Sequence, residues 1–316
     1  MKKALITGIS GFAGSYLAHY LLDKGFKVSG TYLRDDSLLS LPQKEKYVLH
    51  KINLLDEKKT LELIENEKPE YIFHLAALPS PRDSFTKPKE TFINNICAQI
   101  NLLEAIKKTD LTDSRILIIS SAEVYGLVTP ENLPIDEETP FNPTNPYSVS
   151  KLAQDYLGLQ YFLSDKLKII RVRPFNHIGP RQSPMFVVSA FAKRIAEIEK
   201  GRETVMKVGN LSSKRDFTDV RDMIKAYVLA IEKGKPGDVY NLGSGRPHEI
   251  SEILQMMIKL STVKIETEVD EALVAPSDSP ERTCDYSKFR QLTGWKPEIP
   301  IEKTLQDTLE YWREII

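Results

Sequence analysis

The chain has 316 residues, a formal net charge of −1 and only two cysteines, Cys97 and Cys284. The length suits one large domain or two closely joined ones, and the near-neutral charge argues against nucleic acid or an anionic membrane surface as the partner. Two cysteines cannot make a disulfide framework, and no apolar run approaches the roughly 20 residues of a membrane helix. Because the segment Met1–Ala4 leads directly into a strand rather than a signal sequence, we expect a cytoplasmic protein. Its partner should be a small molecule or another protein.

The first expected element is a short apolar strand, Ala4–Thr7, which breaks into a glycine turn before a periodic helix through Leu17 and Leu21. A strand, a glycine turn and a helix in this order are typical of a pyrophosphate site. Glycines let the backbone approach the phosphates and let the helix pack against the strand. We therefore predict that a dinucleotide binds at Gly8, Gly11, Phe12, Ala13 and Gly14.

The end of the second expected strand, Val28–Tyr32, indicates which dinucleotide binds. A carboxylate at this position would bond both ribose hydroxyls of NAD, but the chain continues with Leu33 and Arg34. An arginine close to this position, with no carboxylate at the strand end, suits a ribose 2′-phosphate, so we expect NADP(H) as the preferred cofactor. NAD(H) stays open as the alternative, because Asp35 or Asp36 could bond the ribose instead.

Further cofactor contacts are expected where later strands end. The third expected strand is Tyr47–Ile52, and the corner after it could meet the adenine or simply close a turn. The fourth, Tyr71–Leu75, leads into two alanines whose small side chains suit a backbone that lies against a cofactor. An asparagine in the next helix could reach the cofactor or serve as a cap. These expectations add Asn53, Leu54, Leu75, Ala76, Ala77 and Asn95 to the cofactor site, and Pro174 joins them after the sixth strand.

Strands and helices alternate along the chain, with further strands expected at Ile116–Ser120, Lys166–Val172 and Val239–Gly243. This alternation predicts an α/β protein with a Rossmann-type, doubly wound parallel sheet and a smaller mixed α/β lobe. We expect a dinucleotide-binding domain at 1–174, joined by about 217–243. Residues 175–216 and 244–316 should then form a substrate-binding lobe.

The candidate catalytic residues lie at the start of a helix and at the end of the fifth strand. Asn145-Pro146 suits the cap and first position of a helix, so Tyr147 and Lys151 should share one helix face. A lysine ammonium and a helix N-terminus should both lower the pKa of Tyr147. Ser121 could hold a substrate carbonyl against this tyrosine, which predicts carbonyl and alcohol chemistry. Glu123 could act as a general base, although a hydrogen-bond acceptor is the preferred interpretation.

The loop from Pro174 to Pro184 is dense in prolines and polar groups, which suits contact with a substrate. His177 lies within it, whereas His74 lies in a strand and is expected in the core. A helix is expected from Val187 to Lys200, and Arg215 has the chemistry to clamp a diphosphate. None of the five histidines has the spacing of a metal site, so we expect no metal.

Nearly the whole chain resembles the extended short-chain dehydrogenase/reductases that act on nucleotide sugars. The resemblance is carried by Gly8-x-x-Gly11-x-x-Gly14, Ser121, Tyr147-x-x-x-Lys151, Arg173–Asn176 and Gly294-Trp295-x-Pro297. Within this family, the segments Phe175–Pro180, Phe186–Val188 and Val208–Asp222 are most similar to GDP-4-dehydro-6-deoxy-D-mannose reductases, which make GDP-D-rhamnose.

The resemblance implies NADP(H)-dependent reduction of the C4 keto group of a GDP-linked sugar. Tyr147 would donate the proton, Lys151 would lower its pKa and bond the nicotinamide ribose, and Ser121 would orient the carbonyl. The helices Thr91–Lys107 and Tyr147–Leu163, the latter with Leu152, Tyr156, Leu159 and Phe162, would pair across a two-fold axis in a homodimer. The implied substrate-binding residues are Ser121, Asn176, His177, Val187, Lys193, Arg215 and Arg282.

Two alternatives stay open at this stage. The chain could be a nucleotide-sugar 4-epimerase or a GDP-mannose 4,6-dehydratase that retains its NAD(P), because Glu123 matches the position of the dehydratase base. It could also be a cofactor-binding sensor without activity, against which the intact Ser121, Tyr147 and Lys151 argue. Relatives commonly have an arginine that helps hold the nucleotide where this chain has Ala275. Either Arg282 replaces that cation or nucleotide binding differs from that of the family.

Overall fold

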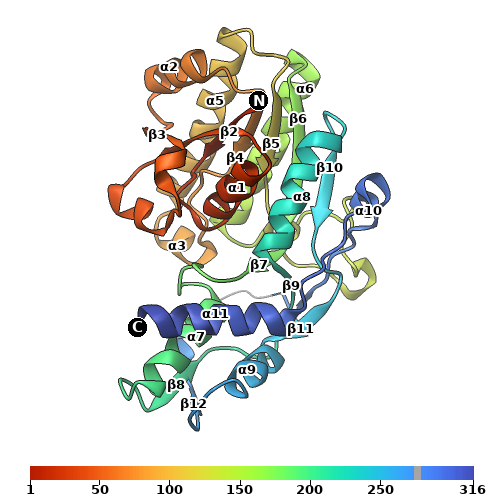
Figure 1. The fold of residues 1–316 in the computed structure, drawn as a ribbon. Coiled ribbons are helices and arrows are strands. Elements are labelled where there is room, and N and C mark those ends of the chain that lie inside the picture. The colour runs from red at the N-terminus through yellow and green to blue at the C-terminus, as the bar shows by residue number, and fades with distance from the viewer. Residues whose placement is uncertain (274–278) are drawn as a thin grey trace.

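A seven-stranded parallel sheet forms the centre of the computed structural model, which describes residues 1–273 and 279–316 (Figure 1). The spatial order is β10-β6-β5-β4-β1-β2-β3, the Rossmann order with β10 added beside β6. The predicted α/β class and doubly wound sheet are therefore confirmed. The strands are β1 (Lys3–Thr7), β2 (Lys27–Tyr32), β3 (Val48–Lys51), β4 (Tyr71–His74), β5 (Arg115–Ile119), β6 (Lys168–Pro174) and β10 (Val239–Leu242).

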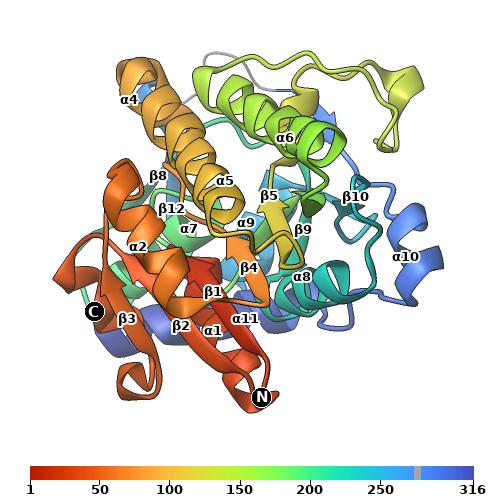
Figure 2. The same cartoon turned by 90° about the horizontal axis from the view of Figure 1, so that it is seen from above.

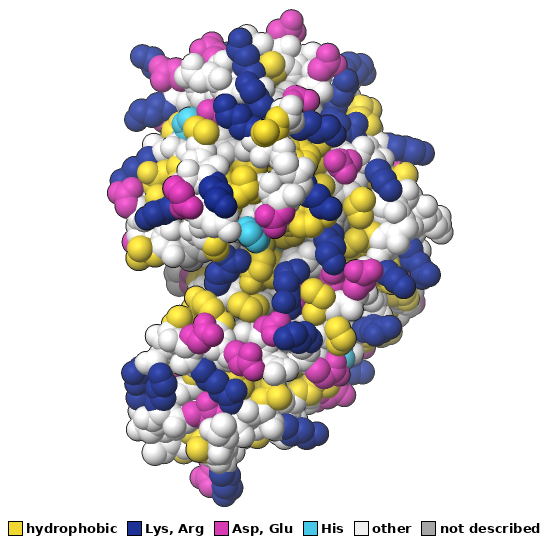
Figure 3. Space-filling model, in the orientation of Figure 1, with side chains coloured by type: hydrophobic (Ala, Val, Ile, Leu, Met, Phe, Trp, Pro, Cys, Tyr) yellow, Lys and Arg dark blue, Asp and Glu magenta, His cyan; other side chains and the backbone are white. Residues whose placement is uncertain are grey.

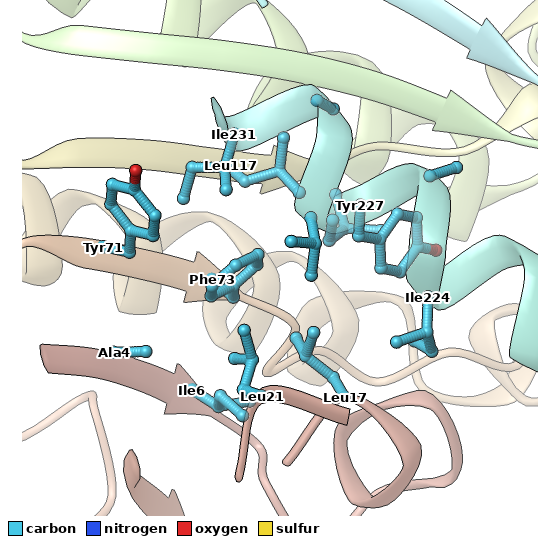
Figure 4. Packing of buried hydrophobic residues seen from close by; sticks show 14 of the residues in the cluster. Ala4, Ile6, Leu17, Leu21, Tyr71, Phe73, Leu117, Ile224, Tyr227 and Ile231 are labelled. Atoms are coloured by element: carbon cyan, nitrogen blue, oxygen red, sulfur yellow. The ribbon is translucent and has the colours of Figure 1, made fainter. Parts of the chain in front are cut away.

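Helices cover both faces of this sheet (Figure 2). One face carries α1 (Phe12–Asp23) and α8 (Val220–Lys233), and the other carries α2 (Glu57–Glu67), α5 (Ala98–Lys108) and α6 (Pro146–Asp165). Successive strand residues point to opposite faces, and both faces are buried. Accordingly Ala4 and Ile6 of β1 belong to the core under α1 and α8 (Figure 4), whereas Leu5 belongs to the core under α5.

A smaller lobe lies beyond the carboxyl ends of the parallel strands, at the bottom of Figure 1. Its helices α7 (Val187–Glu199), α9 (Ile250–Ile258) and α11 (Ile301–Ile315) pack around a separate apolar core. Its two small sheets comprise β7 (Asn176–Ile178), β9 (Lys214–Asp219), β11 (Pro247–Glu249) and β13 (Glu281–Arg282), and the pair β8 (Val205–Val208) and β12 (Glu266–Val269).

The chain returns from the smaller lobe to the large sheet slightly later than expected. Phe217–Asp219 belong to β9 of the smaller lobe, while α8 and β10 belong to the large one. The predicted return at about 217 is thus a few residues early. We propose a division into 1–174 with about 220–243, and 175–219 with 244–316.

The two helices predicted to carry site residues form, with one interruption. Asn145 caps α6 by accepting from Ser148 N at 2.8 Å, and the Ser148 hydroxyl accepts from Asn145 N, which completes a capping box. The helix expected at Thr91–Lys107 is split into α4 (Pro88–Phe92), a π-helical turn (Ile93–Cys97) and α5. Such π-helical turns often accompany functional sites.

No helix in residues 1–273 and 279–316 combines the length and apolar character needed to span a membrane. Both cysteines are free thiols, with Cys97 exposed and Cys284 buried.

Candidate active site

A cavity of about 360 Å³ lies between the two lobes, at the carboxyl ends of the central strands. The space-filling view shows this face hollowed there, with apolar side chains gathered in the hollow (Figure 3). Most of the residues predicted for the site line the cavity together. They are Gly8, Gly11, Phe12, Ala13, Gly14, Leu75, Ala77, Ser121, Glu123, Tyr147, Lys151, Pro174, Asn176, His177, Val187 and Arg282.

The glycine turn between β1 and α1 forms one end of the cavity. Gly8 has a φ of +74°, and a Cβ there would lie 3.1 Å from the Ala76 Cα. A Cβ on Gly14 would lie 2.3 Å from the Gly8 carbonyl oxygen, so the close approach of helix to turn requires glycine. The first turn of α1 has neither a capping side chain nor an acidic residue. Its N–H groups therefore fit the pyrophosphate of a dinucleotide.

Tyr147 and Lys151 lie one turn apart on α6, and both are buried, with 8% and 4% of their surfaces exposed. Ser121 caps a 3₁₀ turn, Ala122–Tyr125, that directly follows β5. The Lys151 ammonium donates to the Ile119 carbonyl oxygen at 2.8 Å. Burial lowers the pKa of Lys151 to about 7, because a charged amine is poorly solvated there.

The pKa of Tyr147 shifts in the direction opposite to the prediction. Burial raises this pKa above its usual value, the hydrogen bond with Ser121 partly lowers it, and the charge of Glu123 raises it again. The prediction of a lowered pKa in this chain was wrong, because it weighed Lys151 and the helix N-terminus but not full burial. Tyr147 consequently holds its proton at neutral pH, as a proton donor to a carbonyl requires.

Glu123 and Arg282 were predicted for separate roles, but they form an ion pair. Glu123 comes from the turn after β5 in the large lobe, and Arg282 comes from β13 in the smaller lobe. Their side chains are 21% and 5% exposed, and both line the cavity. The pair thus joins the two lobes at the wall that also holds Tyr147.

Three aromatic rings line the cavity near the glycine turn. Phe12 stacks on His177 with ring centroids 5.9 Å apart, and His177 meets Tyr227 of α8 edge to face at 6.5 Å. Burial lowers the pKa of His177, so the ring is neutral at physiological pH. His74, by contrast, lies in the core as predicted, 1% exposed and in hydrogen-bond contact with Thr7 Oγ1 at 2.9 Å.

Some predicted cofactor residues lie outside the cavity lining. Asn53 accepts from Leu55 N at 3.0 Å, which closes a turn. Asn95 is fully buried and bonds the Leu78 backbone and the Ser150 hydroxyl, so it fixes the segment after β4 rather than facing the cavity. Arg34 is exposed at the end of β2 and pairs with Asp36 at 3.3 Å. Leu54 and Ala76 also lie outside the lining.

Two predicted substrate residues also lie outside the lining. Lys193 is on α7, where its ammonium pairs with Glu197 at 3.5 Å and lies 6.0 Å from the Trp312 ring centroid. Arg215 is buried on β9 and donates to the Lys214 carbonyl oxygen at 2.7 Å. Their roles in substrate binding stay predictions. Ala275 lies outside the described residues.

Several lining residues were not predicted, among them Gln182, Phe186, Phe217 and Tyr227. Tyr227 continues the apolar face of an amphipathic helix, so its spacing alone indicates a core residue. The Oε1 of Gln182, the hydroxyl of Tyr227 and the Nε of Arg282 are buried and have no hydrogen-bond partner among the described residues. Orphaned polar atoms in a cavity wall fit a site that a polar ligand completes.

Among the described residues, no cluster of three or more His, Cys, Asp or Glu side chains could hold a metal ion.

The Rossmann sheet, the glycine turn and the Ser–Tyr–Lys group on one wall define the class of the extended short-chain dehydrogenase/reductases. Within this class, the chain belongs to the family described as GDP-mannose 4,6 dehydratase, whose sequence profile matches residues 5–308. The resemblance found in the sequence is thereby confirmed.

Individual relatives cover the whole chain. A GDP-6-deoxy-D-mannose reductase of Pseudomonas aeruginosa is 34% identical and aligns over 98% of this chain and 97% of its own. The structure of RMD from Pseudomonas aeruginosa complexed with NADPH matches with a TM-score of 0.88 at 32% identity, over 100% of both chains. A UDP-glucose 4-epimerase from Thermotoga maritima matches with a TM-score of 0.90 at 25% identity, over 99% of both chains.

Proposed function

We propose that this protein reduces the C4 keto group of GDP-4-dehydro-6-deoxy-D-mannose to GDP-D-rhamnose with NADPH. The observation that carries this proposal is the meeting of Ser121, Tyr147 and Lys151 on the wall of a cavity whose far end is the glycine turn. The Pseudomonas aeruginosa reductase, similar over almost its whole length, supports the same reaction.

The roles of the three side chains follow from their surroundings. NADPH, when bound, supplies the hydride that reduces the C4 carbonyl. Tyr147 donates a proton to the carbonyl oxygen as it becomes an alcohol, and Ser121, which shares a hydrogen bond with Tyr147, orients that oxygen. Lys151 lies one turn away, and its ammonium helps to stabilise the tyrosinate that remains after the transfer. General acid catalysis of this kind contributes about 10²–10⁴-fold.

NADPH is the cofactor that the end of β2 suits. Arg34 is exposed there and can meet a 2′-phosphate, while Asp35 and Asp36 are paired with Lys51 and Arg34. The related structure with bound NADPH supports this choice.

A second candidate, nucleotide-sugar dehydration, is favoured by the presence of Glu123 in the cavity wall. A dehydratase recycles its bound cofactor, whereas a reductase consumes NADPH stoichiometrically. Incubation with the 4-keto sugar nucleotide and NADPH should therefore oxidise one NADPH for each sugar reduced. Conversion of GDP-mannose by the purified protein, with no net change in NADPH absorbance, would replace the reductase proposal with dehydration.

The nucleotide of the substrate is tested by calorimetric titration of the NADPH-loaded protein with GDP, UDP and dTDP. The proposed substrate contacts are Ser121, Asn176, His177, Val187 and Arg282 in the cavity lining. Lys193 and Arg215, which lie outside the lining, are predicted around the sugar diphosphate and nucleotide. GDP should bind at least about tenfold more tightly than the other two, a difference of about 1.4 kcal/mol. Preference for UDP or dTDP would change the substrate but leave the Tyr147 chemistry in place.

We also propose that the protein forms a homodimer through the outer faces of α4, α6 and the turn between α4 and α5. Ile93, Val149 and Tyr156 expose 41%, 39% and 51% of their surfaces on these elements, which lie side by side (Figure 2). Phe162, predicted for this interface, instead packs against Gly237 of its own chain, where an added Cβ would lie 2.2 Å from its ring. Sedimentation showing only a 35.9 kDa monomer at micromolar concentration would remove the dimer.

We propose the cytoplasm as the compartment, because two cysteines cannot make the disulfide framework typical of secreted proteins.

A further inference from the structure

The hydroxyl of Tyr227 has no part in the proposed reaction. Tyr227 is fully buried on α8, and it lines the cavity. Its hydroxyl has no hydrogen-bond partner among the described residues. A buried hydroxyl without a partner has lost its bonds to water and gained none in return, so native structures rarely keep one unless a water or a ligand completes it.

The surroundings of Tyr227 indicate which ligand reaches it. Its ring meets His177, which in turn stacks on Phe12 of the glycine turn. Figure 4 shows its hydroxyl directed away from Tyr71 and Leu117, toward the side to which the strand arrows point. A dinucleotide that runs from the glycine turn to Tyr147 must pass along this edge of the sheet. Tyr227 therefore lies on the path of the cofactor.

The other two polar atoms of the cavity wall without a hydrogen-bond partner among the described residues belong to the smaller lobe, not to the large one. Gln182 and Arg282 both come from the smaller lobe, and their unpartnered Oε1 and Nε are available to the sugar nucleotide. Tyr227 comes from the large lobe, which carries the glycine turn. Its place beside the Phe12–His177 stack at the glycine turn favours the cofactor over the sugar as the partner of its hydroxyl.

The chemistry of the hydroxyl narrows the choice of cofactor atom. Burial raises the pKa of Tyr227, and the nearby Tyr147 raises it further, so the phenol stays neutral. A neutral donor in an apolar wall is better suited to a neutral carbonyl acceptor than to a phosphate. Phosphates are usually bound by cations and helix N-termini. At the Tyr147 end of a nicotinamide dinucleotide, the group of this kind is the carboxamide.

We propose that Tyr227 is a cofactor-positioning residue whose hydroxyl donates a hydrogen bond to the carboxamide of the bound nicotinamide. This bond would hold the nicotinamide ring in one orientation relative to Tyr147. The inference rests on the proposed use of a nicotinamide cofactor, but it does not depend on which nucleotide sugar is reduced.

The test is calorimetric titration of full-length Tyr227→Phe with NADPH and with 2′-phospho-ADP-ribose, which lacks the nicotinamide. We expect NADPH to bind about three- to tenfold more weakly than to the wild type, as for the loss of one neutral hydrogen bond, and the fragment to bind unchanged. The thermal midpoint of the free protein should not fall, because the substitution removes an orphaned hydroxyl. A purely structural role would not distinguish the two ligands.

Tyr47→Phe is the matched control, because the Tyr47 hydroxyl is also buried and without a partner among the described residues but does not line the cavity. It should leave the binding of both ligands unchanged. The inference is overturned if Tyr227→Phe leaves NADPH affinity unchanged, weakens both ligands equally, or raises only the KM for the sugar nucleotide. If the wild type binds NADPH but reduces no nucleotide sugar, the proposed function is wrong, but the role of Tyr227 in cofactor binding can still be tested in this way.

Discussion

Arg282 of β13 forms an ion pair with Glu123, which lies 159 positions earlier in the chain, in the turn after β5. The pair crosses from the smaller lobe to the large one at the wall of the cavity. Because the Arg282 side chain is only 5% exposed, its charge depends on Glu123 for compensation. The two residues therefore couple the position of the smaller lobe to the wall that carries Ser121 and Tyr147.

A double-mutant cycle of Arg282→Met and Glu123→Gln measures this coupling. Each single substitution leaves the other group without its partner and should lower the free energy of unfolding by about 1–3 kcal/mol. The double variant should lose less than the sum of the two, with an interaction of at least about 0.5 kcal/mol. Urea denaturation provides the free energies. Strictly additive losses would mean that the pair contributes nothing.

Glu123 is predicted to be an acceptor for Arg282 rather than a general base. Glu123→Gln keeps the shape of the side chain and should therefore retain more than about a tenth of the wild-type turnover, since loss of a catalytic base costs about 10²–10⁴-fold. The measurement is NADPH oxidation with saturating 4-keto sugar nucleotide. A loss as large as that of Tyr147→Phe would assign Glu123 to the chemistry.

Tyr147→Phe should lower turnover by about 10²-fold or more, because the variant has no proton to donate to the carbonyl oxygen. NADPH should still bind, which calorimetry can check on the same preparation. Tyr156→Phe is a suitable control, since Tyr156 lies on the same helix and is 51% exposed. If Tyr147→Phe kept more than about a tenth of the activity, the proposed acid would be the wrong residue.

Arg34→Ala should reduce the preference for NADPH over NADH. A charge-assisted bond to the 2′-phosphate contributes about 1.5–3 kcal/mol, but the Arg34 side chain is 77% exposed, so solvent screening should reduce the effect to about tenfold or less. The ratio of kcat/KM for the two cofactors is the measurement, and NADH serves as the internal control. An unchanged ratio would show that another residue selects the cofactor.

Lys151 should make stability depend on pH above neutrality. Its pKa is about 7 in the folded chain, against 10.5 for an ordinary lysine. Between these values the unfolded state binds more protons than the folded state, so the free energy of unfolding rises with pH. Lys151→Met lacks this group, and its free energy of unfolding should rise less steeply between about pH 7 and 9.5. Urea denaturation of the cofactor-free wild type and variant at several pH values gives the slope of the free energy of unfolding against pH for each. Equal slopes would contradict the prediction.

The parts of the site that depend on residues close together in the sequence could be predicted from it. The order of strand, glycine turn and helix at the N-terminus, the cap at Asn145 and the spacing of Tyr147 and Lys151 all follow from local backbone geometry. Each is present in the structure, and together they indicated both the class of fold and the type of chemistry.

The parts that depend on packing between distant segments required the tertiary structure. Local spacing could not show that Arg282 pairs with Glu123, that Asn95 bonds Ser150, or that Tyr227, on the apolar face of its helix, also lines a cavity. It also predicted the wrong direction for the pKa of Tyr147, because the cost of burying a charge depends on everything that surrounds the residue in space. The sequence by itself therefore determined the fold and the spacing of Tyr147 and Lys151 on one helix, whereas the folded chain decided which charges are paired and which buried polar groups have no hydrogen-bond partner among the described residues.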